Sequence, residues 1–460
     1  MPKQMTAEQK LTYMTETPLP RLVLSLSVPT IVSMLITSFY NMADTYFVGL
    51  IGSASASGAV GVAFPLMAIM QAVGFMFGHG SGNHMARVLG AGDAADARKM
   101  AATGFFSAFF VGLAIMTIGL LAAEPLAYAL GSTPTIAPYA MEYLGYLMPG
   151  APFLIASLVL NNQLRFQGSA FYAMIGITSG AVLNIILDPL FIFTFGMGVA
   201  GAALATSLSQ VVSFFLLLNG TRLGGNIRIH WRDYTPTLAN FREILRGGVP
   251  SLARQSLNSL ATVCLNLASG GYGDAAIAAM SIVTRVMMMT VSAIIGFGQG
   301  FQPICGFNYG AGLYERVRRA FWFCVRLCFC VLVLVSAAAI ALAPQIISLF
   351  LAADPQVQEI GTLALRQQCA LIPLFAFTCL SNMMLQTMGI AGRATVLAMA
   401  RQGLFFIPAV WVLEHAFGLL GVQLAQPVAD VLSFLLAIPL TLPVLRRLRE
   451  SEAAKKVSKT

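Results

Sequence analysis

The sequence is short of charged side chains. Only 10% of its 460 residues are Asp, Glu, Lys or Arg, whereas 57% are hydrophobic. Soluble domains carry about 25% charged residues, and so little charge does not cover the surface of a soluble protein of this length. The apolar surplus must therefore face lipid. Because a helix that spans a bilayer needs about 20 apolar residues, the chain is long enough for about a dozen spans.

Several motifs are also absent, and each absence excludes a class of function. The sequence has no GxxxxGK[ST] loop, so nothing indicates an ATP-driven pump, and it has no HExxH or paired CxxC motif for a metal site. No polar stretch is long enough to hold an enzyme domain. We therefore expect no enzymatic activity, no catalytic residues and no cofactor. Residues 1–20 lack the apolar segment of a signal peptide and are predicted to lie in a cytoplasmic tail.

Cysteine is missing from the first half of the chain. Seven cysteines lie in apolar segments of the second half: Cys264, Cys305, Cys324, Cys328, Cys330, Cys369 and Cys379. No histidine accompanies them at a metal-ligand spacing, and we interpret them as small buried hydrophobic residues.

Long apolar stretches predict an all-α membrane protein with twelve transmembrane helices. They lie at 22–50, 58–85, 100–122, 138–160, 170–195, 199–220, 243–270, 277–305, 320–342, 361–386, 394–414 and 419–445. Of the 27 Lys and Arg residues, 22, including Arg165, fall in one alternating set of loops and tails, and the other set has none. The remaining five lie in apolar segments: Arg254, Arg285, Arg326, Arg366 and Arg401. Because cytoplasmic loops carry an excess of Lys and Arg, both termini are predicted to be cytoplasmic, and the net charge of +9 implies no nucleic-acid partner.

The second half repeats the first at a constant offset in residue number, 220–221. Val28-Pro29 recurs as Val249-Pro250, and Gly90-Ala91-Gly92 recurs as Gly310-Ala311-Gly312. Six spans per half is an even number, so the two halves have the same orientation in the membrane. The predicted organisation is a tail at 1–21, a six-helix lobe at 22–220, a linker at 221–242, a six-helix lobe at 243–445 and a basic tail at 446–460. Two such lobes favour transport by alternating access around a central cleft.

Two acidic residues lie well inside the predicted spans of the first half. Asp44 ends a polar stripe on the first span, whose members recur at spacings of three and four and so share one helical face: Ser33, Thr37, Tyr40, Asn41 and Asp44. We interpret this stripe as the lining of a cavity, although a purely structural hydrogen-bond network is the alternative. Asp430 is a third buried acidic candidate, and Glu142 lies near a span end.

Asp188 lies in the fifth span within the sequence LNIILDPL. Asn184 is one helical turn earlier on the same face, and Pro189 frees a backbone carbonyl near residue 185. Thr206 on the sixth span is placed to add a hydroxyl group. Because burial disfavours an unpaired carboxylate, such a group binds either H⁺ or Na⁺. The pattern predicts cation binding but leaves the choice of ion open, and a polar kink in a packed helix is the alternative.

The second half lacks these acids. The repeat offset aligns Asp44 with Leu265 and Asp188 with Pro408, so we expect ion coupling in the first half and substrate contacts in the second. The matching helix keeps a polar face without an acid: Arg254, Gln255, Asn258, Thr262 and Asn266. Met287, Met288 and Met289 predict an adaptable apolar surface, with ordinary lipid-facing methionine as the alternative.

Four segments together resemble the multidrug and toxic compound extrusion (MATE) family, particularly its bacterial MepA-like branch. They are VPTIVSMLITSFYNMADTYFVG, GSGNHMARVLGAGD, VLNIILDPLFIF with GVAGAALATSLS, and FNYGAG. The resemblance covers essentially the whole chain. It implies a multidrug efflux antiporter of the bacterial inner (plasma) membrane, connected with antibiotic resistance, that exchanges amphipathic and often cationic drug-like compounds for H⁺ or Na⁺.

The resemblance also implies a set of site residues. Cation or proton coupling is expected at Asp44, Asn184, Asp188 and Thr206. If the coupling ion is Na⁺, its expected ligands are Asp44, Asn184 and Asp188. Members of this branch often carry a glutamate on the fourth span, and Asn161 takes that position here. The expected substrate cavity comprises Thr37, Tyr40, Asn41, Asn161, Arg254, Asn258 and Met288. We expect a monomer whose partners are the lipid bilayer and its small-molecule substrates.

Two other functions remain open from the sequence. A flippase for lipid-linked oligosaccharides, of the same broad superfamily, would need a basic cavity, which Arg254 and Arg285 permit. A membrane scaffold without transport activity would not need acids inside its spans.

Overall fold

The computed structural model describes residues 5–350 and 354–457, and in these ranges the chain is helical without β-strands. The first half contains α1 (Ala7–Glu16), α2 (Leu19–Gly49), α3 (Ala54–Gly90), α4 (Ala94–Leu121), α5 (Ala123–Ala129), α6 (Ala137–Leu147), α7 (Ala151–Phe166), α8 (Ala170–Pro189) and α9 (Gly198–Gly220). The second half contains α10 (Leu238–Gly270), α11 (Asp274–Gly310), α12 (Tyr314–Ala341), α13 (Ala343–Ser348), α14 (Pro355–Leu371), α15 (Phe375–Thr387), α16 (Ala391–Met399), α17 (Ile407–Phe417) and α18 (Leu419–Val457).

The predicted all-α membrane architecture is confirmed. Eleven helical segments among the described residues are long and apolar enough to span a bilayer. The predicted span at 243–270 corresponds to α10, which has 33 residues but is not among the eleven. Its polar face, which includes Arg254 and Asn258, lowers its hydropathy, and a helix between two lobes tolerates such a face because protein covers part of it.

Two spans are broken at corresponding places in the two halves. A 3₁₀ turn at Met148–Gly150 joins α6 to α7, and another at Ile372–Leu374 joins α14 to α15. Pro149 and Pro373 lie in these turns, where proline removes a backbone donor and interrupts the α-helical bonding. A π-helical turn at Leu190–Thr194 follows α8, and another at Ala400–Phe406 joins α16 to α17.

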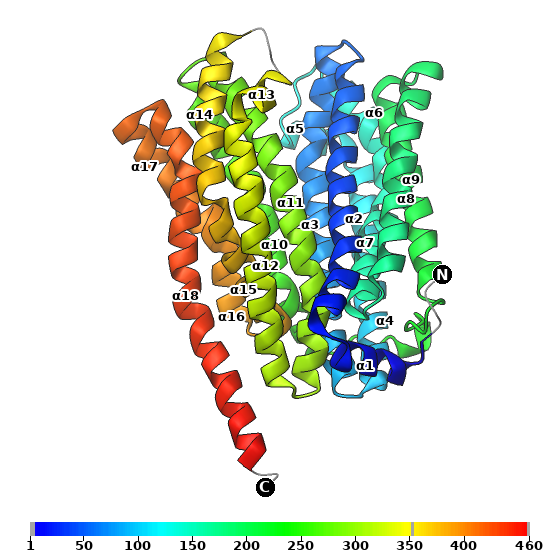
Figure 1. The fold of residues 1–460 in the computed structure, drawn as a ribbon. Helices are drawn as coiled ribbons and strands as arrows, with labels where there is room; N and C mark the ends of the chain where they lie inside the picture. Colours follow the sequence, from blue (N-terminus) through cyan, green and yellow to red (C-terminus); the bar gives the residue numbers. More distant parts are fainter. Residues whose placement is uncertain (1–4, 351–353, 458–460) are drawn as a thin grey trace.

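The two halves form two lobes, each with a buried apolar cluster, and the cluster of the second lobe continues across the junction to first-half residues such as Leu26 and Phe166. Figure 1 shows α2 to α9 on one side of the molecule and α12 to α18 on the other, with α10 and α11 between them. One buried cluster includes Met70, Leu144 and Leu160 of the first lobe, and the other includes Phe321 and Leu380 of the second.

The lobes meet closely toward the end of the bundle where α1 lies, which we call the closed end (Figure 1). An added Cβ on Gly80 of α3 would lie 2.2 Å from the carbonyl oxygen of Ile244 in α10, so only glycine permits this approach. Across the same junction, Thr30 donates a hydrogen bond to the carbonyl of Gly296 at 2.7 Å. Arg87 donates to Glu243 at 3.0 Å and to the carbonyl of Thr387 at 2.8 Å.

The segments outside the predicted spans are more ordered than the sequence indicated. The region predicted as a tail contains α1, whose first turn is capped reciprocally by Thr6 and Gln9. The region predicted as a basic tail continues α18 through Val457. The loops that contain α5 and α13 are also helical, and Trp231 of the linker stacks on Tyr234. The predicted tails also include residues 1–4 and 458–460, which lie outside the described residues.

Candidate functional site

The first lobe encloses a cavity of about 90 Å³ that its helices α2, α3, α7, α8 and α9 line, together with Gln299 of α11. Helix α2 contributes a polar face that includes Thr30, Ser33, Thr37 and Tyr40. Thr37 donates its hydroxyl hydrogen to the carbonyl of Ser33 at 2.8 Å, and Ser33 donates to that of Pro29 at 2.9 Å. The hydroxyl donors are thus used within the helix, which leaves their oxygen lone pairs as acceptors for a ligand.

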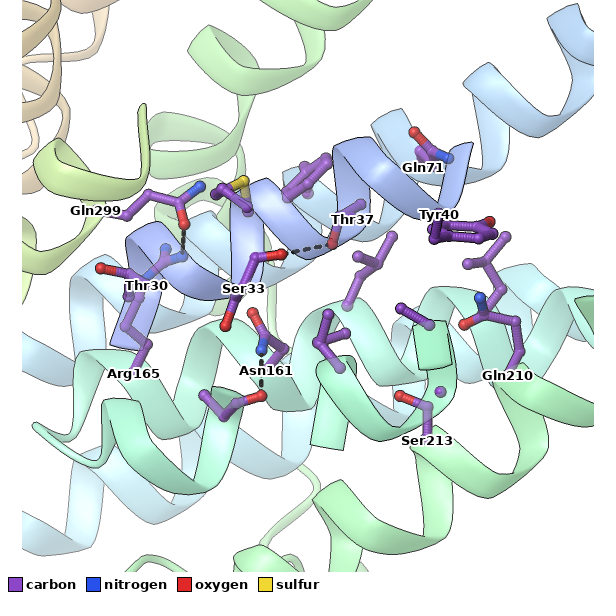
Figure 2. Close-up of a pocket in the computed structure, with 18 of the residues that line it drawn as sticks. Thr30, Ser33, Thr37, Tyr40, Gln71, Asn161, Arg165, Gln210, Ser213 and Gln299 are labelled. Carbon is purple, nitrogen blue, oxygen red and sulfur yellow. Dashed lines mark hydrogen bonds between the residues drawn. The ribbon is translucent and has the colours of Figure 1, made fainter. Parts of the chain in front are cut away.

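The cavity extends along α2 from a basic end to a polar end. Figure 2 shows Thr30, Arg165 and Gln299 together at one end, and Tyr40, Gln71 and Gln210 at the other. Thr30 and Tyr40 are ten residues apart, which corresponds to about 15 Å along an α-helix. Asn184 also lines the cavity, one helical turn before Asp188.

Asp188 is fully buried, and its hydrogen-bond partner is Asn184. The amide nitrogen of Asn184 donates to Asp188 at 3.4 Å and to the hydroxyl of Thr206 at 3.3 Å. With the oxygen and nitrogen of this amide exchanged, the nitrogen donates to Asp188 at 3.1 Å and the oxygen accepts from the backbone nitrogen of Thr206 at 3.2 Å. In both orientations the amide joins α8 to α9 and presents an N–H group to the carboxylate.

Asp44 and Asp188 lie within electrostatic range of each other, which their sequence positions did not show. One carboxylate oxygen of Asp44 is buried without a hydrogen-bond partner among the described residues. The phenol groups of Tyr40 and Tyr143 lie within electrostatic range of both carboxylates. Tyr143 of α6 is fully buried and was not selected from the sequence. The residues expected to bind the coupling cation are thus neighbours.

Asp430, the third acidic candidate, has a basic partner. Arg401 donates to its carboxylate at 2.6 Å, and Gln426 donates to the same oxygen at 3.0 Å. The Arg401 guanidinium also lies over the ring of Phe375, 4.3 Å from its centroid. The charge of Asp430 is therefore neutralised within the second lobe, unlike that of Asp188. Glu142 is exposed.

Asn161 lines the cavity but also has a packing role. Its amide nitrogen donates to the carbonyl of Ala173 at 3.0 Å, which joins α7 to α8. The same bond recurs at the equivalent place in the second lobe, where Asn382 donates to the carbonyl of Ala394 at 2.6 Å. The amide nitrogen of Asn161 is therefore used by the scaffold, and its oxygen is left for a ligand.

Four residues expected in the substrate cavity do not line this one: Asn41, Arg254, Asn258 and Met288. Asn258 is exposed and Met288 is 50% exposed, while Asn41 and Arg254 are partly buried. Arg254 and Asn258 belong to α10 of the second lobe, and Met288 belongs to α11. Their role in substrate binding stays a prediction.

Arg165 corrects one assignment made from the sequence. It was counted among the cations of cytoplasmic loops, but it is 1% exposed and lines the basic end of the cavity. Its guanidinium donates to Gln299 at 2.5 Å, to Asn162 at 2.6 Å and to His79 at 3.3 Å. The residue lies near the end of α7, where hydropathy alone does not distinguish a loop cation from a buried one. The internal repeat contained a sign that Arg165 is not a loop cation, because it aligns Arg165 with the uncharged Gln386.

The comparisons with known proteins agree with this architecture. The MatE family profile matches residues 29–190 and 250–412, so it matches each half of the chain once. The multidrug export protein MepA of Staphylococcus haemolyticus (strain JCSC1435) is 27% identical over 97% of this chain and 98% of its own. The MepA of Staphylococcus aureus (strain NCTC 8325 / PS 47) is 27% identical over 94% and 95%.

Solved structures extend the likeness to the fold. A crystal structure described as MATE in complex with MaL6 has a TM-score of 0.90 and 26% identity, over 96% of this chain and 99% of that chain. An outward-facing multidrug resistance MATE transporter of the MOP superfamily has a TM-score of 0.90 and 26% identity, over 97% and 100%. The family profile covers more than half of the chain. The chain therefore belongs to the MatE family, and it is a membrane transporter of the MepA branch.

Proposed function

We propose that this transporter exports amphipathic, often cationic, drug-like compounds in exchange for H⁺ or Na⁺. Its curated relatives are named multidrug export proteins, which supports the substrate class and does not favour the flippase alternative. The observation that supports ion coupling is the environment of Asp188. Its carboxylate is fully buried and has no basic partner among the described residues. A buried carboxylate of this kind is stabilised by a bound cation or proton.

The coupling unit consists of Asp44, Asn184, Asp188 and Thr206. Two carboxylates in electrostatic range repel each other when both are ionised, and a proton or a Na⁺ ion relieves this repulsion. The amide of Asn184 offers its N–H to Asp188 in the described arrangement, which suits a carboxylate that gains and loses a proton. Coordination of Na⁺ by this amide requires its oxygen to turn toward the carboxylate.

Exchange follows if the coupling ion and the drug favour opposite conformations. Contacts such as Arg87 with Glu243 hold the lobes together at the closed end, and these contacts must break for that end to open. An ion that stabilises one conformation lowers the affinity for a drug that stabilises the other, and the effect is reciprocal. We place the closed end and both termini on the cytoplasmic side of a bacterial plasma membrane, where the protein acts as a monomer.

The test is ion-driven transport by the purified protein in proteoliposomes. Efflux of the cationic dye rhodamine 123 is followed under an imposed pH gradient, and separately under a Na⁺ gradient. We expect one of the two gradients to drive efflux. If neither gradient drives efflux of any tested cation while a lipid-linked sugar crosses the bilayer, the antiporter proposal is wrong.

The variant Asp188→Asn tests the residue that carries the proposal. We expect it to lose ion-driven efflux while it folds normally, because the amide retains hydrogen-bonding capacity but does not take up a proton or offset a cation. Asp44→Asn should cause a severe but partial loss. The matched control is Asp93→Asn, which makes the same change at the exposed N-cap of α4, where asparagine caps as well as aspartate. Full ion-driven efflux by Asp188→Asn would exclude Asp188 from coupling.

A further inference from the structure

The basic end of the cavity has a charge that the proposed export of cations does not explain. Arg165 is the charged residue of the cavity lining, and no carboxylate joins it there among the described residues. Its three hydrogen-bond partners, Gln299, Asn162 and His79, are side chains that do not carry a negative charge. Its Nε–H group is buried and has no partner in the described structure. A cavity built only for cations would place an acid here.

His79 is neutral in this arrangement, so it does not change the local charge. Its Nδ1 lies 3.1 Å from the carbonyl oxygen of Phe75, which only accepts, so Nδ1 carries the hydrogen. Its Nε2 lies 3.3 Å from the guanidinium of Arg165, which only donates, so Nε2 is the acceptor. Arg254 lies within electrostatic range of Arg165 and adds a second positive charge. Neither Asp44 nor Asp188 lines the cavity.

The repeat shows that the fold does not need a cation at this position. Gln386 takes the place of Arg165 in the second lobe, at the same repeat offset as the other matches. It is equally buried, and its amide donates to the carbonyl of Gly247 at 2.6 Å and to Ser251 at 2.8 Å. A neutral amide therefore satisfies the packing of the equivalent helix. Burying a guanidinium instead is expensive unless a negative group comes to pair with it.

We propose that Arg165 binds a carboxylate of the transported substrate, so that the preferred substrates are zwitterionic amphipathic compounds. This inference rests on the proposed export function and specifies its substrate class. The carboxylate lies at the Arg165 end of the cavity. The cavity of about 90 Å³ holds a functional group but not a whole drug, for which pockets of about 300–1,000 Å³ are usual. In the closed conformation it is therefore a subsite.

Lobe movement supplies a way to load this subsite. Gln299, which accepts from Arg165, belongs to α11 of the second lobe, whereas Arg165 belongs to the first. Opening of the closed end separates the two side chains and leaves one more guanidinium N–H group without an acceptor. A buried donor without a partner is unfavourable, and a carboxylate is its strongest replacement because two N–H groups bind it at once. The carboxylate would then take the place of the Gln299 oxygen.

The experiment compares two dyes that differ in one group. Rhodamine 110 is a zwitterion with a free carboxylate, and rhodamine 123 is its methyl ester and a cation. Binding of each dye to the purified full-length protein is measured by fluorescence polarisation. We expect the wild type to bind rhodamine 110 about tenfold or more tightly than rhodamine 123, the range for a charge-assisted hydrogen bond. Equal affinities for the acid and the ester would overturn the proposal, and this result requires no variant.

The variant Arg165→Gln introduces the residue type that Gln386 supplies at the equivalent position of the second lobe. We expect its loss of affinity for rhodamine 110 to exceed its loss of affinity for rhodamine 123 by about tenfold or more. Arg165→Lys retains the charge without the planar fork and should lose less. An equal loss for both dyes would instead identify Arg165 as a structural residue. The thermal unfolding of each variant is measured beside its binding.

Transport separates this inference from the proposed function. If a pH or Na⁺ gradient drives efflux of rhodamine 123 by the wild type, and Arg165→Gln lowers the ratio of rhodamine 110 efflux to rhodamine 123 efflux, both proposals stand. If neither gradient drives efflux of either dye, the antiport proposal fails, while the binding comparison still decides the role of Arg165.

Discussion

Asp188 and Asp430 are the same residue type, almost equally buried, in opposite electrostatic settings. Asp188 has an amide and a second carboxylate near it, whereas Asp430 has an arginine at 2.6 Å. An unpaired buried carboxylate needs a mobile cation, and a paired one does not. The first residue is thus suited to coupling and the second to structure. The sequence placed both inside spans but did not show which of them had a basic partner on another helix.

Loss of the Asp430 carboxylate should destabilise the fold. In Asp430→Asn the Arg401 guanidinium stays buried without a counter-charge, which in buried ion pairs costs about 3–5 kcal/mol. We expect a clearly lower midpoint of thermal unfolding in detergent and a reduced yield of folded protein. Asp188→Asn is the comparison, because it removes a carboxylate of equal burial that has no basic partner among the described residues. Equal unfolding midpoints for the two variants would contradict this assignment.

At the scale of single elements, α1 connects the two lobes at the closed end. Lys10 donates to Ser169 of the first lobe at 3.1 Å and to Asn226 of the linker. Asn308 of the second lobe donates to the carbonyl of Met14 at 3.1 Å. The sequence indicated only a polar tail here, because ten residues with little apolar periodicity resemble a linker until their partners are known. The Thr6 and Gln9 spacing was the one helical signal.

Docking of α1 should depend on pH through Lys10. Burial lowers the pKa of the Lys10 amine to about 8 from its ordinary value of 10.5. Between these values the undocked or unfolded state binds more protons than the native state, so native stability rises from pH 8 to pH 10.5 and is independent of Lys10 below pH 8. We expect the thermal unfolding midpoint to rise over this range relative to Lys10→Met. A wild-type profile parallel to that of Lys10→Met would show that the amine stays protonated when buried.

The span boundaries were the most predictable part of the fold. Each of the twelve predicted spans lies on a helix or on a pair of helices in nearly the same residue range, because lipid imposes a long apolar length on each. The breaks at Pro149 and Pro373 and the depth of Arg165 were not predicted. Helix breaks, depth and the rotation of one helix against another depend on packing between spans, which a hydropathy profile does not contain.

At the scale of the whole molecule, the proposed exchange requires the closed end to open. Arg87 of the first lobe and Glu243 of the second form an ion pair at 3.0 Å across it, and Arg246 also donates to Glu243 at 2.9 Å. The Arg87–Glu243 pair joins the two lobes, whereas the Arg246–Glu243 pair lies within α10 and positions the Glu243 carboxylate. The strength of the Arg87–Glu243 pair sets how often the lobes part in the absence of substrate.

The variant Glu243→Gln should favour the open conformation. A hydrogen bond between charged groups contributes about 1.5–3 kcal/mol, so its weakening should raise the ratio of open to closed molecules about tenfold. The measurement is the distance between spin labels at Lys99→Cys and Leu313→Cys, exposed positions in the first and second half respectively. Exposed Cys330 and partly buried Cys264 are first replaced by serine. An unchanged distance distribution would show that Glu243 does not hold the lobes closed.

The equivalent side-chain hydrogen bonds of Asn161 and Asn382 bear on the ancestry of the two halves. If the two halves descend from one duplicated half, a hydrogen bond that occupies the same place in both is inherited from it. Arg165 and Gln386, which also occupy one equivalent place, differ and so diverged after the duplication. Descent has therefore preserved the helix packing of a once symmetric protein and has redistributed its charges.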